Sequence, residues 1–160
     1  MRKIFAGLAV SFGMVSAVCG PISAFTLPDD IGEWRAVSTA VTPLITEYNH
    51  ESQGSVTFRT YKRESPSAIL DVILTEGAGT GKLYVPEKVN DSEGMMPCES
   101  GFELVKVSGH DAILESQPHM PLALAVMLGL DATLTIETAS LSREQIIGFT
   151  ENMIEYQTIP

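Results

Sequence analysis

The sequence TLTIETASLSREQ, residues 133–145, places a strand pattern directly before a helix start. In its first half the apolar residues Leu134 and Ile136 alternate with polar residues, which is the two-residue period of a strand with one buried face. In its second half Ser142 and Gln145 stand three positions apart and form the pattern of a capping box at a helix N-terminus. The stretch therefore predicts a strand followed by a helix that begins after Ser142.

The residues around this stretch extend it into a module that runs from Gly101 to Ile154. Phe102–Val107 and Ala112–Ser116 are predicted to be strands, because they flank a Ser-Gly-His-Asp turn sequence. Behind the cap, apolar residues follow at helical spacing. They are Ile146, Ile147, Thr150, Met153 and Ile154. We expect two or three neighbouring antiparallel strands with this helix packed on one face of the sheet.

Further strands are predicted before the module. Glu33–Ser38 contains the single tryptophan, Ser55–Lys62 is rich in β-branched and aromatic residues, and Ala68–Thr75 is apolar on both faces, which favours a central strand. Thr42–Tyr48 fits either a strand or a short helix. The order favours an α+β fold, mainly an antiparallel sheet with one or two helices packed on one face, including the C-terminal helix.

The run Pro121–Leu130 contains no charged or hydrogen-bonding side chain. Its Leu, Ala and Met content favours a short helix over a strand, and a helix without a polar face exposes apolar surface unless something covers it. We therefore predict a contact for a partner protein or ligand at Leu122, Leu124, Met127 and Leu128. The alternative is that the run passes through the core as a further strand.

Residues 1–24 have the pattern of a secretory signal peptide. A basic start is followed by an apolar run of about 17 residues and by small residues before position 25. Cleavage after Ala24 would leave residues 25–160 as a single exported domain in the periplasm or outside the cell. The run is at the lower limit for crossing a bilayer, so a retained anchor is the alternative. After processing we expect no stable membrane span.

The charge balance is strongly acidic. The chain has 20 Asp and Glu against 10 Lys and Arg, for a formal net charge of −10. Removal of residues 1–24 takes away Arg2 and Lys3 and no acid, which makes the net charge −12. Such a domain is repelled by nucleic acid, so nucleic-acid binding is not expected.

Cys98 would be the one cysteine left after cleavage, because Cys19 lies in the predicted leader. Its acidic neighbours disfavour the thiolate that a catalytic cysteine needs. Whether the thiol is free, buried or joined to another molecule stays open. Cys98, His119 and Met120 are ligand types for copper, and a soft-metal site at these residues is an alternative function.

No enzyme motif is complete. Gly77–Lys82 is similar to a phosphate-binding loop, but only three residues separate its outer glycines instead of four, and Leu83 stands where Ser or Thr should follow the lysine. We predict a flexible connection here. No cofactor is expected, and an uncharacterised periplasmic enzyme remains an alternative.

The C-terminal third of the chain resembles a module of small secreted bacterial domains of unknown function and is loosely similar to the Mog1/PsbP-type α/β sandwich. The resemblance is carried by Val107–Ala112, Thr133–Glu137 and Leu141–Glu144. It implies a secreted domain with a last helix, and no catalytic residue comes with it. The predicted function is a non-catalytic exported domain that binds a partner protein, a second copy of itself or an apolar ligand.

Overall fold

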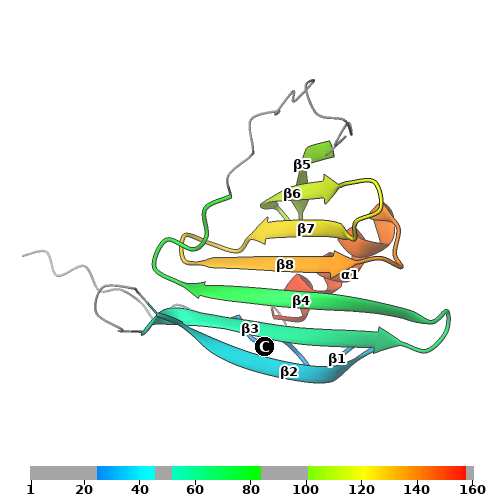
Figure 1. Ribbon diagram of the computed structural model, residues 1–160, viewed down its shortest axis with the longest axis horizontal. Helices are drawn as coiled ribbons and strands as arrows, with labels where there is room; N and C mark the ends of the chain where they lie inside the picture. The colour runs from blue at the N-terminus through cyan, green and yellow to red at the C-terminus, as the bar shows by residue number, and fades with distance from the viewer. Residues whose placement is uncertain (1–24, 46–51, 84–100, 158–160) are drawn as a thin grey trace, which may run out of the picture.

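A computed structural model describes residues 25–45, 52–83 and 101–157 of the chain. These residues form one antiparallel sheet with the strand order β1-β2-β3-β4-β8-β7-β6-β5 (Figure 1). The strands are β1 (Asp30–Ile31), β2 (Trp34–Ile45), β3 (Ser52–Arg63), β4 (Ala68–Gly77), β5 (Gly101–Val107), β6 (His110–Ser116), β7 (Leu122–Met127) and β8 (Ala132–Thr138). The single described helix, α1 (Arg143–Tyr156), follows β8.

Strand β8 lies between β4 and β7 and has the face pattern that its sequence predicts. Leu134 and Ile136 are fully buried, Thr138 is also buried, and Glu137 is exposed. On the neighbouring strand Leu74 lies opposite Leu134, and Val72 lies opposite Ile136. The predicted buried face of the strand is therefore confirmed.

The turn between β5 and β6 lies where it is predicted, but it has two residues, Ser108 and Gly109, and not the four of the predicted turn sequence. Ser108 and Gly109 both have positive φ, 46° and 83°. Two such residues form the tight turn whose twist matches that of antiparallel strands, and glycine adopts this conformation without a steric cost. Strand β6 begins at His110, two residues before the predicted start.

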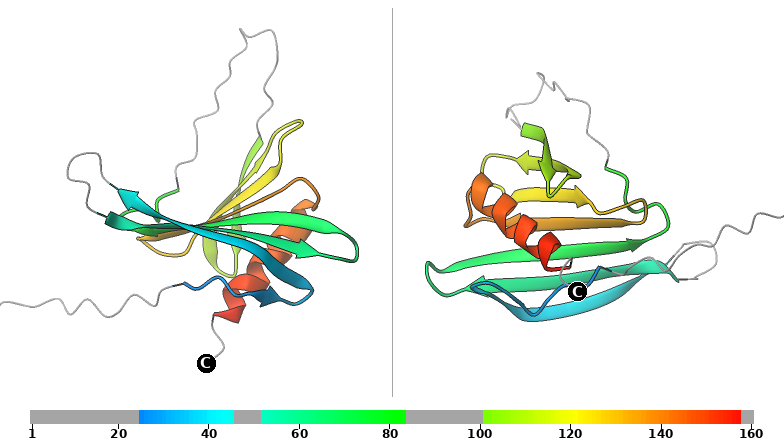
Figure 2. Two further views of the ribbon diagram at one scale, coloured as in Figure 1. Left: turned by 60° about the horizontal axis from the view of Figure 1, so that its bottom comes forward. Right: turned by 180° about the vertical axis from the view of Figure 1, so that it is seen from behind.

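Helix α1 begins as predicted and packs on one face of the sheet (Figure 2). The Ser142 side chain accepts a hydrogen bond from the Gln145 backbone N–H, and the Gln145 side chain accepts one from the Ser142 N–H. Phe149, which was not among the predicted core residues, contacts the rings of Trp34 and Tyr61 edge-on, with centroids 5.3 and 5.7 Å apart. Ile147, which was predicted to be buried, is only partly so.

Tyr61 joins the core to the chain before β1. The side chain is fully buried, and its hydroxyl donates a hydrogen bond to the Pro28 carbonyl at 2.6 Å. Burial disfavours the phenolate and raises the pKa of Tyr61 above its ordinary value. Leu27 and Ile31 are buried alongside, so residues near the start of the described chain complete the covering of this face.

The helix predicted over Pro121–Leu130 is wrong. Residues 122–127 form β7, which pairs with β6 on one side and with β8 on the other. Hydrogen bonds from two neighbouring strands outweigh the helix preference of Leu, Ala and Met, since intrinsic propensity is small compared with tertiary context. Leu124 and Val126 are fully buried, as the alternative interpretation of a further strand requires.

The antiparallel sheet and the C-terminal helix are confirmed, but the fold is dominated by its sheet. The described residues contain eight strands and one helix, so this part of the chain is mostly sheet and is not clearly an α+β fold. Within the described part of the chain, no helix is long and apolar enough to cross a membrane. The predicted leader and Cys98 lie outside the described residues.

Candidate functional site

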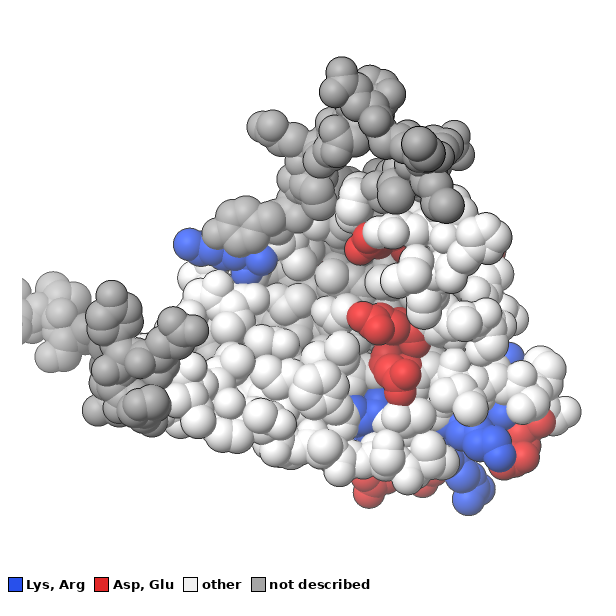
Figure 3. All heavy atoms as spheres, viewed as in Figure 1, with Lys and Arg blue, Asp and Glu red and all other residues white. Residues whose placement is uncertain are grey.

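Helix α1 covers only one face of the sheet, and no described element packs against the other face (Figures 1 and 2). We call this second surface the open face. Because side chains alternate along a strand, it carries the residues that lie between the buried ones. Figure 3 views the open face and shows a broad uncharged surface with a small acidic group near its middle.

The strand registers align the open face into three rows that run across the strands. A central row crosses seven strands from β2 to β5. Its members, in spatial order, are Ala40, Phe58, Ile73, Thr135, Ala125, Ile113 and Leu104. With strands about 4.8 Å apart, six spacings give this row a length of about 29 Å.

The central row has no charged residue and is most exposed toward its ends. Phe58 is 44% exposed and Leu104 is 70% exposed, whereas Ile113 is buried. Large apolar side chains that stay in water, as those of Phe58 and Leu104 do, are unfavourable in the isolated molecule, because each gains on the order of 1.5–3 kcal/mol when it is fully buried. The row is therefore a surface that a partner can cover.

An acidic row borders the central row on one side. Its members are Thr60, Asp71, Glu137, Ala123, Glu115 and Phe102. Asp71 and Glu137 lie directly opposite each other on β4 and β8. Like charges in this position destabilise a sheet, so the pair is unfavourable for the isolated fold. Thr60 donates a hydrogen bond to the Asp71 carboxylate at 2.7 Å.

The other border of the central row is uncharged from β2 to β7. It consists there of Thr42, Val56, Thr75, Thr133 and Met127. Beyond β7 it ends at Lys106 and Asp111, which pair with each other on the β5–β6 hairpin. The open face is thus asymmetric, with a net negative charge along one side of an apolar stripe and no net charge along the other.

Hollows lie at both ends of the central row. One of about 530 Å³ is lined by Leu83, Leu104, Ile113 and Met127, with Lys106 and Asp111 at its wall. Lys106 and Asp111 form an ion pair across the β5–β6 hairpin. Near the other end, a hollow of about 340 Å³ includes Phe58 and Ile73.

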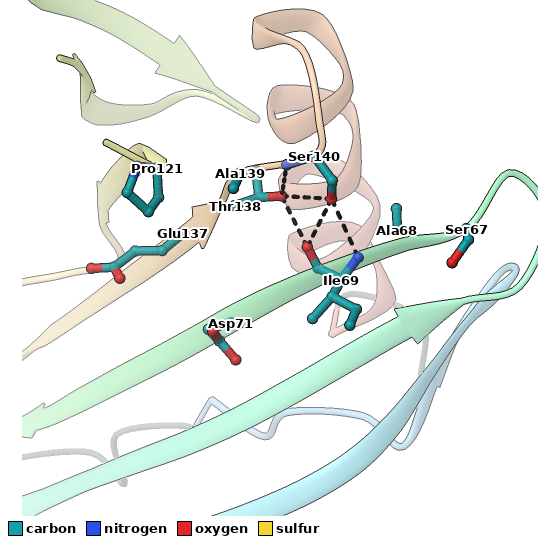
Figure 4. A pocket seen from close by; sticks show the side chains of 9 residues that line it. All are labelled: Ser67, Ala68, Ile69, Asp71, Pro121, Glu137, Thr138, Ala139 and Ser140. Carbon is teal, nitrogen blue, oxygen red and sulfur yellow. Dashed lines mark hydrogen bonds between the residues drawn. The ribbon is translucent and has the colours of Figure 1, made fainter. Parts of the chain in front are cut away.

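A third hollow of about 410 Å³ adjoins the acidic row (Figure 4). Asp71 and Glu137 project from their strands in different directions and do not converge on a common point. The hydroxyls beside them are engaged in structure, since those of Thr138 and Ser140 both donate to the Ile69 carbonyl, at 2.9 and 3.1 Å. This geometry joins β4 to the end of β8 and provides no nucleophile paired with a base.

The residues predicted to contact a partner are divided between the two faces. Leu124 is fully buried on the α1 side, and Leu122 and Leu128 are half-buried against the core. Met127 points to the open face and lines the larger end hollow. Of the four predicted contact residues, Leu124 therefore faces the core, and Met127 is the one on the open face.

The predicted soft-metal residues are only partly described. His119 and Met120 are neighbours in the exposed turn between β6 and β7, where His119 has a φ of 67°. Cys98 lies outside the described residues. Among the residues that the structure describes, no three His, Cys, Asp or Glu side chains are grouped so that they could hold a metal ion.

The glycine-rich segment Gly77–Lys82 is hydrogen-bonded to the turn before β8. The Gly77 and Gly81 amides donate to the backbone carbonyls of Asp131 and Leu130, and the Gly79 amide donates to the Asp131 carboxylate at 2.8 Å. The Gly79 N–H, which a bound phosphate would need as a donor, is thus already hydrogen-bonded to a carboxylate.

Comparisons with protein-family models, with curated proteins and with solved structures found no match to this chain.

Proposed function

We propose that this chain is a non-catalytic exported domain that binds a partner protein through its open face. The observation that supports the proposal is the central row, an uncharged stripe about 29 Å long with Phe58 and Leu104 exposed toward its ends. Exposed apolar patches of this kind on a protein surface often mark interaction sites.

The shape of the face favours a protein over a small apolar ligand. A pocket for a small molecule buries most of the ligand surface, which requires an enclosed site. The hollows at the ends of the central row are open, and Leu104 in the larger one is itself 70% exposed. Side chains that protrude from a partner surface can fill such hollows without being enclosed.

The acidic row defines the chemistry of the partner. A surface that fits the open face carries an apolar ridge, to cover the central row, and Lys or Arg along one side of it, to meet Asp71, Glu137 and Glu115. Complementary charge of this kind speeds association and fixes the orientation of the complex. A helix of about 19 residues has the length of the row, at 1.5 Å per residue.

Site-specific photocrosslinking in the exporting cell tests the proposal. A photoreactive phenylalanine derivative is placed at position 104, on the central row, or at position 130 as the matched control. Leu130 is a suitable control for two reasons. Its side chain is as accessible as that of Leu104, at 79% exposed, and it lies away from the central row, in the turn between β7 and β8. We expect one protein to crosslink at position 104 in much higher yield than at position 130. Equal yields at both positions, or none at 104, would contradict the proposal.

A further inference from the structure

The outer edge of the sheet at β2 has backbone groups without a strand partner over most of its length, within the described residues. The short strand β1 pairs only with Trp34 and Arg35, at the beginning of β2. The Ala36 N–H still donates to the Asp29 carbonyl, and from Val37 to Ile45 the outer side of β2 is not paired with another strand of the described chain. Such an edge is a template for pairing with a further strand.

The uncovered part of β2 is also free of charge. Its nine residues, VSTAVTPLI, include no Asp, Glu, Lys or Arg, in a chain that has 30 such residues. Val37, Val41 and Ile45 along this edge are between 56% and 64% exposed. Charges often protect natural edge strands and are missing here, so Pro43 and the β-bulge at Val37 are the protective features that β2 does have.

The opposite edge of the sheet is protected in the usual way. On β5, Glu103 accepts hydrogen bonds from two nitrogens of Arg143, and Lys106 pairs with Asp111. Two copies of the chain would therefore meet at β2 without like charges across the contact, whereas β5 presents charged side chains to any added strand.

We propose that two copies of this chain associate through β2, in antiparallel register about Ala40. In this register Ala40 faces its own copy, Thr39 faces Val41 and Ser38 faces Thr42. Pro43, which has no N–H to donate, then lies opposite Val37, the extra residue of a β-bulge between Ala36 and Ser38. Pro43, which cannot donate a hydrogen bond, thus lies opposite Val37, where the bulge already interrupts the regular pairing of the strand.

The pairing extends the function proposed above without competing with it. A two-fold axis perpendicular to the sheet keeps both α1 helices on the same side, so the two open faces lie side by side. Val41, which points to the α1 side but is 64% exposed there, becomes covered by Thr39 of the second copy. The dimer then presents two central rows to a partner.

Sedimentation equilibrium of the full chain over a wide concentration range tests the association. We expect a dimer, and we expect Val41→Lys to raise its dissociation constant at least tenfold, because the two introduced ammonium groups lie diagonally across the contact. Leu130→Lys is the matched control and should leave the constant unchanged. Thermal melting confirms that both variants remain folded.

Disulfide formation tests the register. In a chain with Cys19 and Cys98 replaced by serine, Ala40→Cys should yield a covalent dimer on mild oxidation. Thr42→Cys, on the same face, should not, because its two copies lie about 14 Å apart in this register, beyond the reach of a disulfide. A wild-type chain that stays monomeric, a dimer unaffected by Val41→Lys, or equal crosslinking at positions 40 and 42 would overturn the proposal.

Discussion

At the scale of single residues, Tyr61 shows how one buried polar group ties the first described residues to the sheet. Its hydroxyl reaches the Pro28 carbonyl, and its ring packs against Phe149 of α1. Replacement by phenylalanine keeps the ring but leaves the carbonyl without this donor. An unpaired buried polar group costs about 1–3 kcal/mol, so Tyr61→Phe should lower the free energy of unfolding by that amount near neutral pH.

The same residue predicts a pH dependence. The pKa of Tyr61 is raised above its ordinary value of 10.0 because burial disfavours the charged phenolate. The unfolded chain therefore loses this proton first, and the stability that Tyr61 contributes falls as the pH rises above 10.0. Denaturant titrations should show the wild type and Tyr61→Phe converging at alkaline pH. A constant difference between them would contradict this account.

At the scale of elements, β7 is the strand whose sequence is least typical of its structure. Leu124 is fully buried between β6 and β8, so Leu124→Ala should cost about 2–5 kcal/mol of unfolding free energy. Leu130→Ala, at an exposed turn position, should stay within about 0.5 kcal/mol of the wild type. Urea denaturation compares the two. Equal costs would mean that β7 is not an interior strand.

Elements with their own periodicity could be predicted from the sequence, and the others could not. The alternation of apolar and polar residues in β8 identifies its buried face, and the capping box marks the start of α1. β7 lacks an alternating pattern because small or apolar residues occupy both of its faces. Its conformation follows from the two neighbouring strands, which a local pattern does not contain.

The candidate site could not be predicted from any single strand, because it depends on how the strands are aligned with one another. Alternation places Thr135 of β8 on an outer face, but Phe58 and Ile73 are apolar residues that their own strand sequences do not mark as exposed. Their alignment into one row requires the registers between strands, including the pairing of β4 with β8 across a long stretch of sequence. The central row therefore appears only in the assembled sheet.

At the scale of the whole molecule, the acidic row should control how binding responds to salt. Glu137→Gln should weaken binding of the crosslinked partner a few-fold and reduce its salt dependence, because exposed charges are screened over about 10 Å at 0.1 M salt. Glu155→Gln, an exposed position on α1, is the matched control and should change neither property. Binding titrations at low and high salt measure both. Identical behaviour of the two variants would exclude a role for the acidic row.

The most direct test of the open face as the binding surface is the affinity of the purified, crosslinked partner for Phe58→Glu. Phe58 lies near the opposite end of the central row from the crosslinking position, and a carboxylate there would be buried in the complex. Calorimetric titration should show at least a tenfold rise in Kd for Phe58→Glu and no change for Leu130→Glu, with both variants folded. An unchanged Kd for Phe58→Glu would contradict the account, because the partner would then bind without covering the central row.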